Sequence, residues 1–268
     1  MRAVPPKRPQ GLRHLAEASE APGSVRSIGK AFEVLEAFAG RERALSLVEL
    51  AQASGLDKSS VQRVTRTLRD IGYLDQDPVT RRYMLGSRVL DLSYNYLRTH
   101  PLIERALPVL VDLRRVVKER VDLVVPDHDT VLYVLRMQAK RETFRPALIG
   151  RRVPVFCTAA GRAMLAHDDE AEAARIINAS DRVAYTRHTL TDPDAILSEI
   201  RRARRQGYAV QSEEWLPVEM VGAAAVLDSQ GAPIAAVNIA VSTRDWERDA
   251  FEQEMMPPLM AAAAELSR

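Results

Sequence analysis

Several features that would place this chain in a familiar class are missing from its sequence. The 268 residues include a single cysteine, Cys157, which excludes an internal disulfide. The apolar runs, such as residues 221–227, are far shorter than the roughly 20 residues that a membrane-spanning helix needs. Residues 1–22 contain no apolar segment typical of a secretion signal. We therefore expect a cytoplasmic protein with no membrane partner.

Catalytic and metal-binding signatures are missing as well. The sequence contains no HExxH, CxxC, GxSxG or GxGxxG motif. Its histidines show no metal-ligand spacing, and Asp127-His128-Asp129 is typical of a hairpin turn rather than of a metal site. Apolar neighbours favour a buried, inert thiol at Cys157. We expect no catalytic residue, no metal and no cofactor, so the chain is not expected to be an enzyme.

Excess charge of one sign is also missing, because the formal net charge is only +2. Bulk charge therefore does not indicate nucleic-acid binding, and such a function has to rest on where particular side chains point. The length favours two domains. The sequence divides into a disordered basic tail over residues 1–23, a compact unit over residues 24–86, a linker helix over residues 87–100 and a larger domain over residues 101–268.

The compact unit has the pattern of three helices followed by a hairpin. Ser46 and Glu49 have the spacing of a capping box, and Asp57 is a suitable N-cap. The predicted elements are helices over about residues 28–38, from Ser46 to Gly55 and from Asp57 to Ile71, and then strands over residues 73–76 and 81–85. Two short strands after three helices form a wing.

The third helix has chemistry suited to DNA. Val61, Val64, Leu68 and Ile71 are spaced by three or four residues, which places them on one face. The opposite face carries arginine, which pairs with guanine or phosphate, and glutamine, which pairs with adenine in the major groove. The residues predicted to contact DNA from this helix, its surroundings and the wing are Ser46, Lys58, Ser59, Gln62, Arg63, Arg66, Arg81 and Arg82. A solvated amphipathic helix and a solvated turn remain the alternative interpretations.

Five segments, taken in order, resemble the IclR family of bacterial transcriptional regulators over residues 24–268. They read SIGKAFEVLEAF, LSLVELAQASGLDKSSVQRVTRTLRDIGYL, RRYMLGSRVLDLS, IGRRVPVFCTAAGRAMLA and RRARRQGYAVQSEEW. The resemblance implies an α+β protein, with a winged helix-turn-helix domain and a GAF/PAS-like domain that binds a small-molecule effector. It also implies homodimers, often paired into tetramers, that bind a double-stranded DNA operator.

The second domain is expected to mix helices with an antiparallel sheet. The predicted strands cover residues 121–125, 131–137, 221–227 and 234–241, and the predicted helices cover residues 102–117, 159–166, 170–178 and 193–206. A last helix starts near Trp246, and Pro257 and Pro258 are expected to kink or split it.

The resemblance implies an effector pocket on one face of this sheet. Its expected lining residues are Phe156, Thr158, Ala159, Met220, Val221, Gly222, Asn238 and Ala240. Asn238 is the best polar candidate, although a structural amide is an alternative, and Thr158 is favoured as a helix cap.

The segment VEMVGAAAV, residues 218–226, departs from the family pattern, which often has glycine, a basic residue and cysteine or serine there. This departure predicts a more apolar pocket floor and favours an aromatic acid as effector. Arg136 and Arg145 could balance a carboxylate on the effector, but exposed strand positions are the favoured interpretation.

Two other functions remain as alternatives. The second domain could be a small-molecule enzyme, with the first unit serving assembly, although no polar catalytic cluster is evident. The winged helix could instead bind a protein, and the outward Gln62, Arg63 and Arg66 argue against that. A shallow dependence of affinity on salt would favour protein binding, because phosphate contacts make DNA binding strongly salt-dependent.

Overall fold

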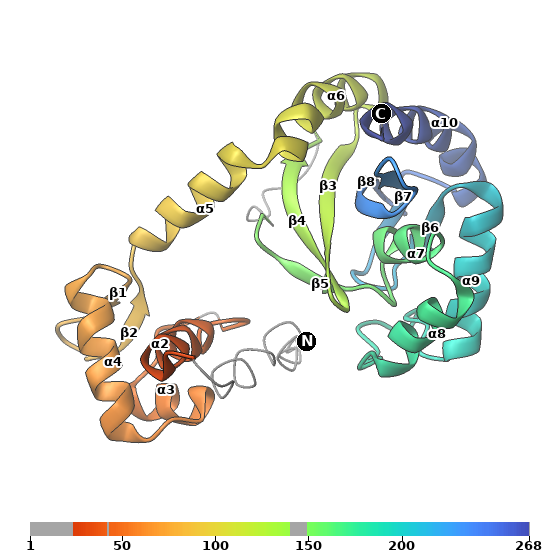
Figure 1. The fold of residues 1–268 in the computed structure, drawn as a ribbon. Helices are drawn as coiled ribbons and strands as arrows, with labels where there is room; N and C mark the ends of the chain where they lie inside the picture. The colour runs from red at the N-terminus through yellow and green to blue at the C-terminus, as the bar shows by residue number, and fades with distance from the viewer. Residues whose placement is uncertain (1–23, 42, 140–148, 268) are drawn as a thin grey trace. The chain divides into compact units, whose positions relative to one another are not determined.

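The chain divides into two compact units, which are described separately. The computed structural model describes residues 24–41, 43–139 and 149–267. Unit 1 is Met1–Thr99 and unit 2 is His100–Arg268 (Figure 1). The predicted tail, residues 1–23, lies outside the described residues. None of the described helices is long and apolar enough to cross a membrane.

Unit 1 consists of three helices, a two-stranded hairpin and a fourth helix. The elements are α2 (Arg26–Glu36), α3 (Leu47–Ser54), α4 (Lys58–Asp70), β1 (Leu74–Gln76), β2 (Tyr83–Leu85) and α5 (Arg88–Thr99). β1 and β2 pair antiparallel, so the predicted wing is confirmed. The first helix ends at Glu36, two residues earlier than predicted, because turns occupy residues 37–40. The predicted linker helix corresponds to α5.

Polar side chains fix where α3 and α4 begin. The Ser46 hydroxyl accepts a hydrogen bond from the Glu49 N–H at 3.3 Å, and the Glu49 carboxylate accepts one from the Ser46 N–H at 2.8 Å, which confirms the capping box. The Asp57 carboxylate caps α4 by accepting from the Ser60 N–H at 2.8 Å. Gly55 turns the chain between the two helices at a φ of 76°, where a side chain would be strained. The helix-turn-helix therefore follows from local chemistry.

Unit 2 is built on a six-stranded antiparallel sheet in the order β5-β4-β3-β8-β7-β6. The strands are β3 (Arg120–Asp127), β4 (Thr130–Met137), β5 (Arg152–Pro154), β6 (Ala209–Ser212), β7 (Glu219–Leu227) and β8 (Pro233–Ser242). The helices are α6 (Pro101–Val117), α7 (Ala159–Leu165), α8 (Glu170–Ala179), α9 (Pro193–Gln206) and α10 (Arg248–Leu266). The expected α+β architecture is confirmed.

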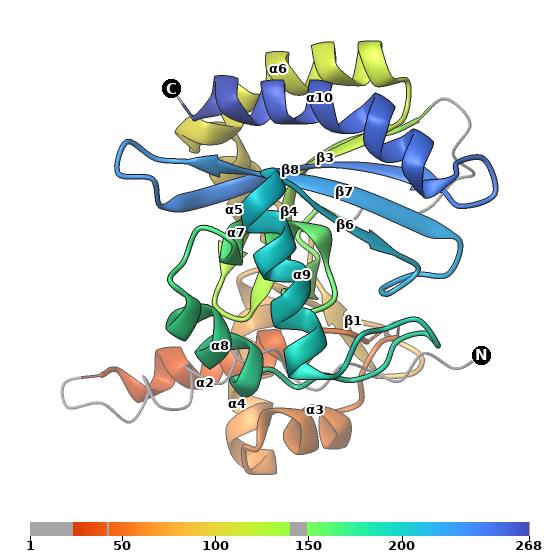
Figure 2. The same cartoon turned by 90° about the vertical axis from the view of Figure 1, so that its right-hand side faces the viewer.

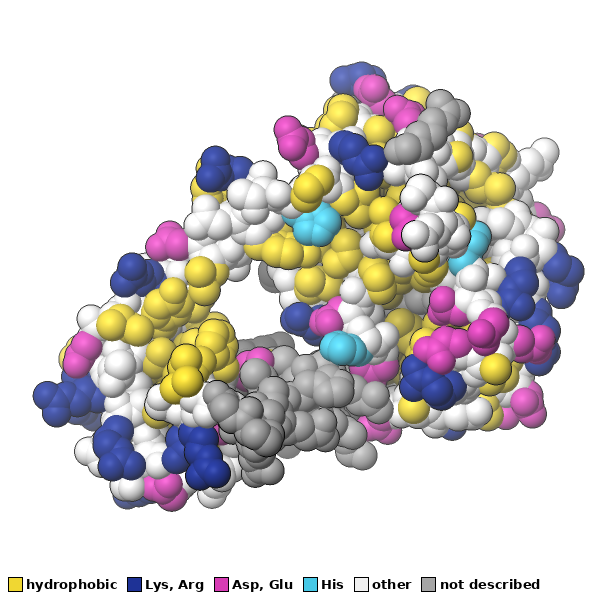
Figure 3. Space-filling view, in the orientation of Figure 1, with side chains coloured by type: hydrophobic (Ala, Val, Ile, Leu, Met, Phe, Trp, Pro, Cys, Tyr) yellow, Lys and Arg dark blue, Asp and Glu magenta, His cyan; other side chains and the backbone are white. Residues whose placement is uncertain are grey.

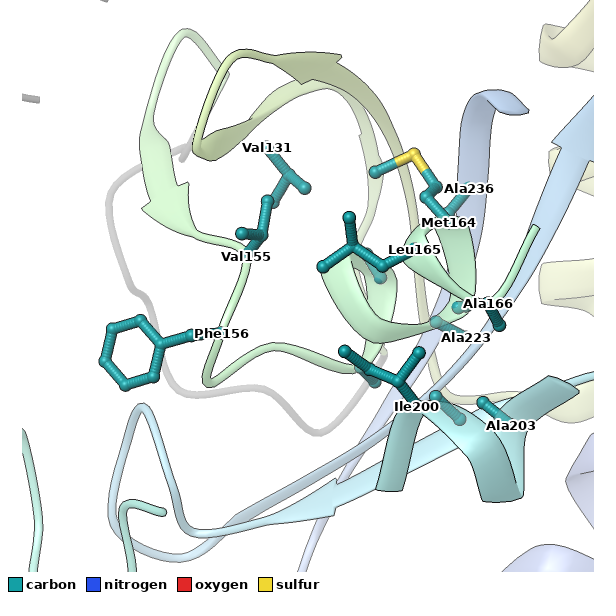
Figure 4. Packing of buried hydrophobic residues seen from close by; sticks show 14 of the residues in the cluster. Val131, Val155, Phe156, Met164, Leu165, Ala166, Ile200, Ala203, Ala223 and Ala236 are labelled. Atoms are coloured by element: carbon teal, nitrogen blue, oxygen red, sulfur yellow. The ribbon is translucent and has the colours of Figure 1, made fainter. Parts of the chain in front are cut away.

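Helices cover both faces of the sheet. α6 and α10 lie against one face, and α7 lies against the other with α8 and α9 beyond it (Figure 2). The core under α7 combines strand residues such as Val131, Ala223 and Ala236 with the helix residues Met164 and Leu165 (Figure 4). The sheet therefore has two internal faces, and the parity of a strand residue decides which of them it lines.

Three features of unit 2 differ from the sequence prediction or were absent from it. β5 and β6 were not predicted, because strands of three and four residues are too short to show a period. α10 is one continuous helix, so of the two predicted outcomes, a kink or a split at Pro257 and Pro258, the split does not occur. Burial of Phe251, Met256 and Leu259 on both sides of the prolines holds the helix together despite the missing N–H groups.

Candidate DNA-contacting surface and effector site

The outer face of α4 presents the predicted polar side chains to solvent. Ser59, Gln62, Arg63 and Arg66 are all exposed. The inner face differs in two places from the prediction, because Thr65 is fully buried beside Val61 and Leu68, whereas Ile71 is 44% exposed. In Figure 3, Lys and Arg side chains are prominent on the surface of unit 1. A helix anchored on its inner side therefore displays a donor-rich outer side.

Local contacts set the starting positions of the α4 side chains. The Ser59 hydroxyl donates to the Asp57 carboxylate at 2.6 Å, so it must exchange this acceptor before it can donate to a phosphate. Hydrogen bonds from Ser59 and Ser60 lower the pKa of Asp57 below its usual range, which keeps the cap ionised. The Arg66 guanidinium lies 3.9 Å from Asp70, and both side chains are exposed. Such a surface pair is weak and is easily replaced by a phosphate.

The two wing arginines differ in their surroundings. Arg81 is exposed in the turn at a φ of 57°. Arg82 instead donates to the Glu49 carboxylate at 2.7 Å and to the Ala44 carbonyl at 3.0 Å, which ties the wing to the start of α3. The hydrogen bond from the Ser46 N–H, together with the positive charges of Arg82 and Arg43, lowers the pKa of Glu49 to about 2. A DNA contact from Arg82 would compete with its hydrogen bonds to Glu49 and Ala44. The sequence did not predict this role of Glu49.

Lys58 and Ser46 flank the recognition surface. Lys58 is exposed at the first position of α4. Ser46 is half-buried, and its hydroxyl is engaged in the capping box described above. Several of the predicted side chains are therefore available to DNA, because no intramolecular hydrogen bond competes strongly for them. These side chains are Gln62, Arg63, Arg66 and Lys58.

The residues predicted to bind the effector do not all lie on one side of the sheet. Val221 and Ala240 pack in the core under α7, and Asn238 shares their face by strand parity. A Cβ atom on Gly222 would lie 2.3 Å from Cε of Met256 on α10, so Gly222 and Met220 line the opposite face. The expectation that Met220 and Gly222 share a pocket with Asn238 was therefore wrong.

Phe156, Thr158 and Ala159 lie at the start of α7, and all three are buried. The Thr158 hydroxyl accepts from the Gly161 N–H at 3.2 Å and donates to the Pro154 carbonyl at 3.0 Å, which confirms its role as a cap. The Phe156 ring points away from the labelled Met164 and Leu165 side chains in Figure 4.

An aromatic cluster stands beside this start of α7. The Phe156 ring stacks at 6.3 Å from Tyr185, and Tyr185 meets Trp215 edge-on at 4.3 Å. Arg151 covers the Trp215 ring at 5.2 Å. Burial raises the pKa of the Cys157 thiol above its usual range, as expected of an inert core residue.

A charged cluster that the sequence did not reveal lies on the α7 face of the sheet. The Arg120 guanidinium donates to Asp122 at 3.0 Å and to Glu219 at 2.8 Å, and all three are buried. The Arg136 side chain is only 3% exposed and lies 3.8 Å from Asp122. The expectation of an exposed Arg136 was therefore wrong, and Arg145 lies outside the described residues.

A second buried ion pair connects α7 with the segment between β6 and β7. Both terminal nitrogens of Arg162 donate to the Glu214 carboxylate at 2.6 Å, and the Arg162 side chain is 1% exposed. Leu190 also donates its N–H to Glu214 at 3.1 Å. Glu214 follows another acidic residue in the sequence, and nothing in that pattern predicted that Glu214 is buried.

Among the described residues, no group of histidine, cysteine and acidic side chains could hold a metal ion. Asp127 ends β3 and Thr130 begins β4, so the Asp127-His128-Asp129 segment is the predicted hairpin turn. His128 adopts the turn conformation at a φ of 56°.

Comparison with known proteins gives the same division of the chain. Residues 27–78 match the model of the IclR helix-turn-helix domain, and residues 94–268 match that of the bacterial transcriptional regulator IclR C-terminal domain. The HTH-type transcriptional regulator KdgR of Escherichia coli is 30% identical over 252 residues, covering 94% of this chain and 95% of KdgR.

Solved structures show the same fold. The transcriptional regulator of this type from Alicyclobacillus acidocaldarius superposes with a TM-score of 0.79 at 27% identity, covering 91% of this chain and 98% of that one. An IclR homologue from Microbacterium hydrocarbonoxydans, complexed with 4-hydroxybenzoate, has a TM-score of 0.73 at 24% identity, covering 90% and 97%. This chain therefore belongs to the IclR family of bacterial transcriptional regulators, with a DNA-binding helix-turn-helix domain followed by an effector-binding domain.

Proposed function

We propose that unit 1 reads a specific operator through the outer face of α4. The observation that carries this proposal is the exposed set of Gln62, Arg63 and Arg66 on a helix whose other face is anchored in the core. Arginine and glutamine can each make two hydrogen bonds to one base, which gives both affinity and sequence discrimination. Lys58 and Arg81 add positive charge that suits the adjoining phosphates.

We further propose that the protein binds DNA as a homodimer that can pair into a tetramer. One recognition helix contacts few base pairs, and two-fold operators require two. The apolar side chains of α5 support a contact between copies, because Leu90, Leu92 and Tyr94 are between 55% and 64% exposed. Exposed apolar side chains concentrated on one helix are typical of an interaction surface.

The effector of unit 2 is proposed to be a small organic acid, and an aromatic acid is the first candidate. The half-buried Tyr185 and Trp215 rings support this choice, because aromatic ligands stack on such rings. The structural relative complexed with 4-hydroxybenzoate is consistent with the same class.

The test is fluorescence anisotropy with labelled DNA from just upstream of the protein's own coding region, at two salt concentrations and with random DNA as competitor. Wild-type protein should bind this DNA in preference to random DNA, and more weakly at high salt. Arg63→Ala/Arg66→Ala should bind at least about 30-fold more weakly, since each of the two pairings with a base contributes about 1–3 kcal/mol.

A matched control removes the same charge elsewhere. Arg115 and Arg175 are exposed on helices of unit 2, so Arg115→Ala/Arg175→Ala should leave the affinity for DNA within about twofold. Equal losses in the two double variants would show that general charge, and not the α4 face, determines binding.

A further inference from the structure

Three polar side chains stand side by side across the middle of the unit 2 sheet. Arg136 on β4 is the cross-strand partner of Asp122 on β3, and Asp122 is the partner of Asn238 on β8. The next residue of this row is Ala223 on β7. Paired residues on neighbouring strands point to the same face, and here it is the face under α7. This set of Arg136, Asp122 and Asn238 is called the polar row.

Two acceptor atoms of the polar row have no donor among the described residues. Oδ2 of Asp122 accepts from Arg120, but Oδ1 of Asp122 accepts no hydrogen bond, and neither does Oδ1 of Asn238. Asp122 is fully buried and Asn238 is 1% exposed, so bulk water does not supply the missing donors. Buried acceptors are nearly always satisfied, and leaving two neighbouring ones without donors is costly.

The nearest side-chain donor to Oδ1 of Asp122 is Nε of Arg136, which lies 3.8 Å away and therefore beyond hydrogen-bond distance. The residues beside Asn238 on this face are Ala236 and Ala240 on its own strand and Ala223 across from it, and none of these side chains can donate. The backbone groups of β8 are already engaged with β3 and β7. An amide that served only the fold would be expected to have a partner here.

The charges of the surrounding cluster balance one another. Arg120 and Arg136 provide two positive charges, and Asp122 and Glu219 provide two negative charges. Among the described residues, these charges leave no net positive charge to attract a carboxylate, and Oδ1 of Asp122 and Oδ1 of Asn238 still lack hydrogen-bond donors. Burial, reinforced by the like charge of Glu219, raises the pKa of Asp122 to about 6 despite the two arginines, as expected of a carboxylate that is short of donors.

We propose that Asp122 and Asn238 bind a hydroxyl group of the effector, so that the sheet selects hydroxylated organic acids over their unsubstituted counterparts. Arg120 acts as a positioning residue, because its bonds to Asp122 and Glu219 hold the Asp122 carboxylate in place. The inference rests on the proposed effector-binding function of unit 2 and specifies which part of the ligand the sheet recognises.

The first test measures binding of matched compounds by calorimetry. The pairs are 4-hydroxybenzoate with benzoate and with 4-methoxybenzoate, 3,4-dihydroxybenzoate with benzoate, and gluconate with hexanoate. At least one hydroxylated compound should bind wild-type protein tenfold or more tightly than its partners, because a site built for a hydroxyl rejects analogues without the donor. If every unsubstituted acid binds as well, or if no hydroxylated compound binds, the proposal is overturned.

The second test separates a ligand-binding amide from a structural one. Asn238→Leu replaces the unsatisfied amide with an apolar side chain of similar size, so the midpoint of thermal unfolding without ligand should rise while the preference for hydroxylated acids disappears. A fall in that midpoint would show that the amide supports the fold and would overturn the proposal. Asp122→Asn should also lose the preference, whereas the control Asp127→Asn, at the partly exposed end of the same strand, should retain it.

Failure of the proposed regulatory function and failure of the polar-row assignment would give different experimental results. Asn238→Leu should bind upstream DNA as tightly as wild type when no ligand is present, because the substitution lies in unit 2. If the wild-type protein itself shows no preference for upstream DNA, the proposed regulatory function is at fault. If DNA binding is normal and only the hydroxyl preference is missing, the assignment of the polar row is wrong.

Discussion

The two units place their charged side chains in opposite ways. In unit 1 the carboxylates of Glu49, Asp57 and Asp77 lie at the surface, where backbone and hydroxyl donors lower their pKa values. In unit 2 the carboxylates of Asp122 and Glu214 are buried with arginines. Similar residue types therefore shape local backbone in one unit and form internal networks in the other.

We expect this difference to reflect what each unit is proposed to bind. A DNA-binding surface meets phosphates and base edges from outside, so its arginines must remain accessible, as Arg63 and Arg66 are. A small molecule is recognised inside a domain, where a few placed polar groups decide its orientation. Under the proposals above, the buried Asp122 serves recognition as well as structure.

The largest effect on stability is expected from Arg162→Ala, because it leaves the buried Glu214 carboxylate without its partner. Breaking such a pair costs about 3–5 kcal/mol of unfolding free energy. Both tryptophans, Trp215 and Trp246, lie in unit 2, so tryptophan fluorescence during urea unfolding reports on this unit alone.

The exposed pair of Arg175 and Glu172 provides the control. Arg175→Ala should change the unfolding free energy by less than about 1 kcal/mol, since exposed pairs contribute little. Losses of similar size in Arg162→Ala and Arg175→Ala would remove the distinction between buried and surface charge in this protein.

The structure of unit 1 could be predicted from the sequence because its signals are local. The capping box at Ser46, the cap at Asp57 and the turn at Gly55 act within a few residues, so the pattern and the structure agree. Ile71 was misplaced and the burial of Thr65 was not predicted, because helical periodicity alone does not show where a neighbouring element ends.

The candidate site of unit 2 was harder to predict from the sequence, because it depends on pairing between strands that are distant in the chain. Arg120 and Asp122 alternate with apolar residues, a pattern that normally indicates a solvated face, but here α7 and its neighbours cover that face. The contact of Arg120 with Glu219 spans 99 positions in the chain, and no local spacing predicts it. The assignment of Met220 failed for the same reason, since strand parity became clear only once α10 was placed.

A smaller effect comes from comparing one helix cap in each unit. Ser46→Ala removes a half-buried cap and should cost about 1 kcal/mol. Thr158→Val removes a buried cap that also donates to Pro154, so it should cost about 2 kcal/mol. Hydrogen exchange should locate the first loss in α3 and the second in α7.

Thr158→Ser retains the hydroxyl and is the matched control, with an expected cost well below that of Thr158→Val. If Ser46→Ala proved more costly than Thr158→Val, burial would not be what distinguishes the caps of the two units.

The smallest effect is a difference in pH dependence between Glu49 and Asp122. The folded-state pKa of Glu49 is lowered from 4.5 to about 2, so its contribution to stability is present above pH 4.5 and is lost as pH falls toward 2. Glu49→Gln should therefore be less stable than wild type at pH 7, and the difference should shrink on acidification. Hydrogen exchange in α3 provides the measurement.

For Asp122, stability should change with pH in the opposite direction. Its folded-state pKa is raised from 3.8 to about 6, so the folded state binds the extra proton and wild-type stability falls as pH rises between these values. The charged and titratable groups that face this carboxylate are Arg120, Arg136, Glu219 and Tyr133. Asp122→Asn should therefore gain stability relative to wild type as pH rises from about 4 to above 6, read by tryptophan fluorescence. The stability of each variant relative to wild type should change with pH in opposite directions for Glu49→Gln and Asp122→Asn. A change in the same direction would mean that burial does not distinguish the carboxylates of the two units, because only a buried, donor-poor carboxylate has its pKa raised by folding.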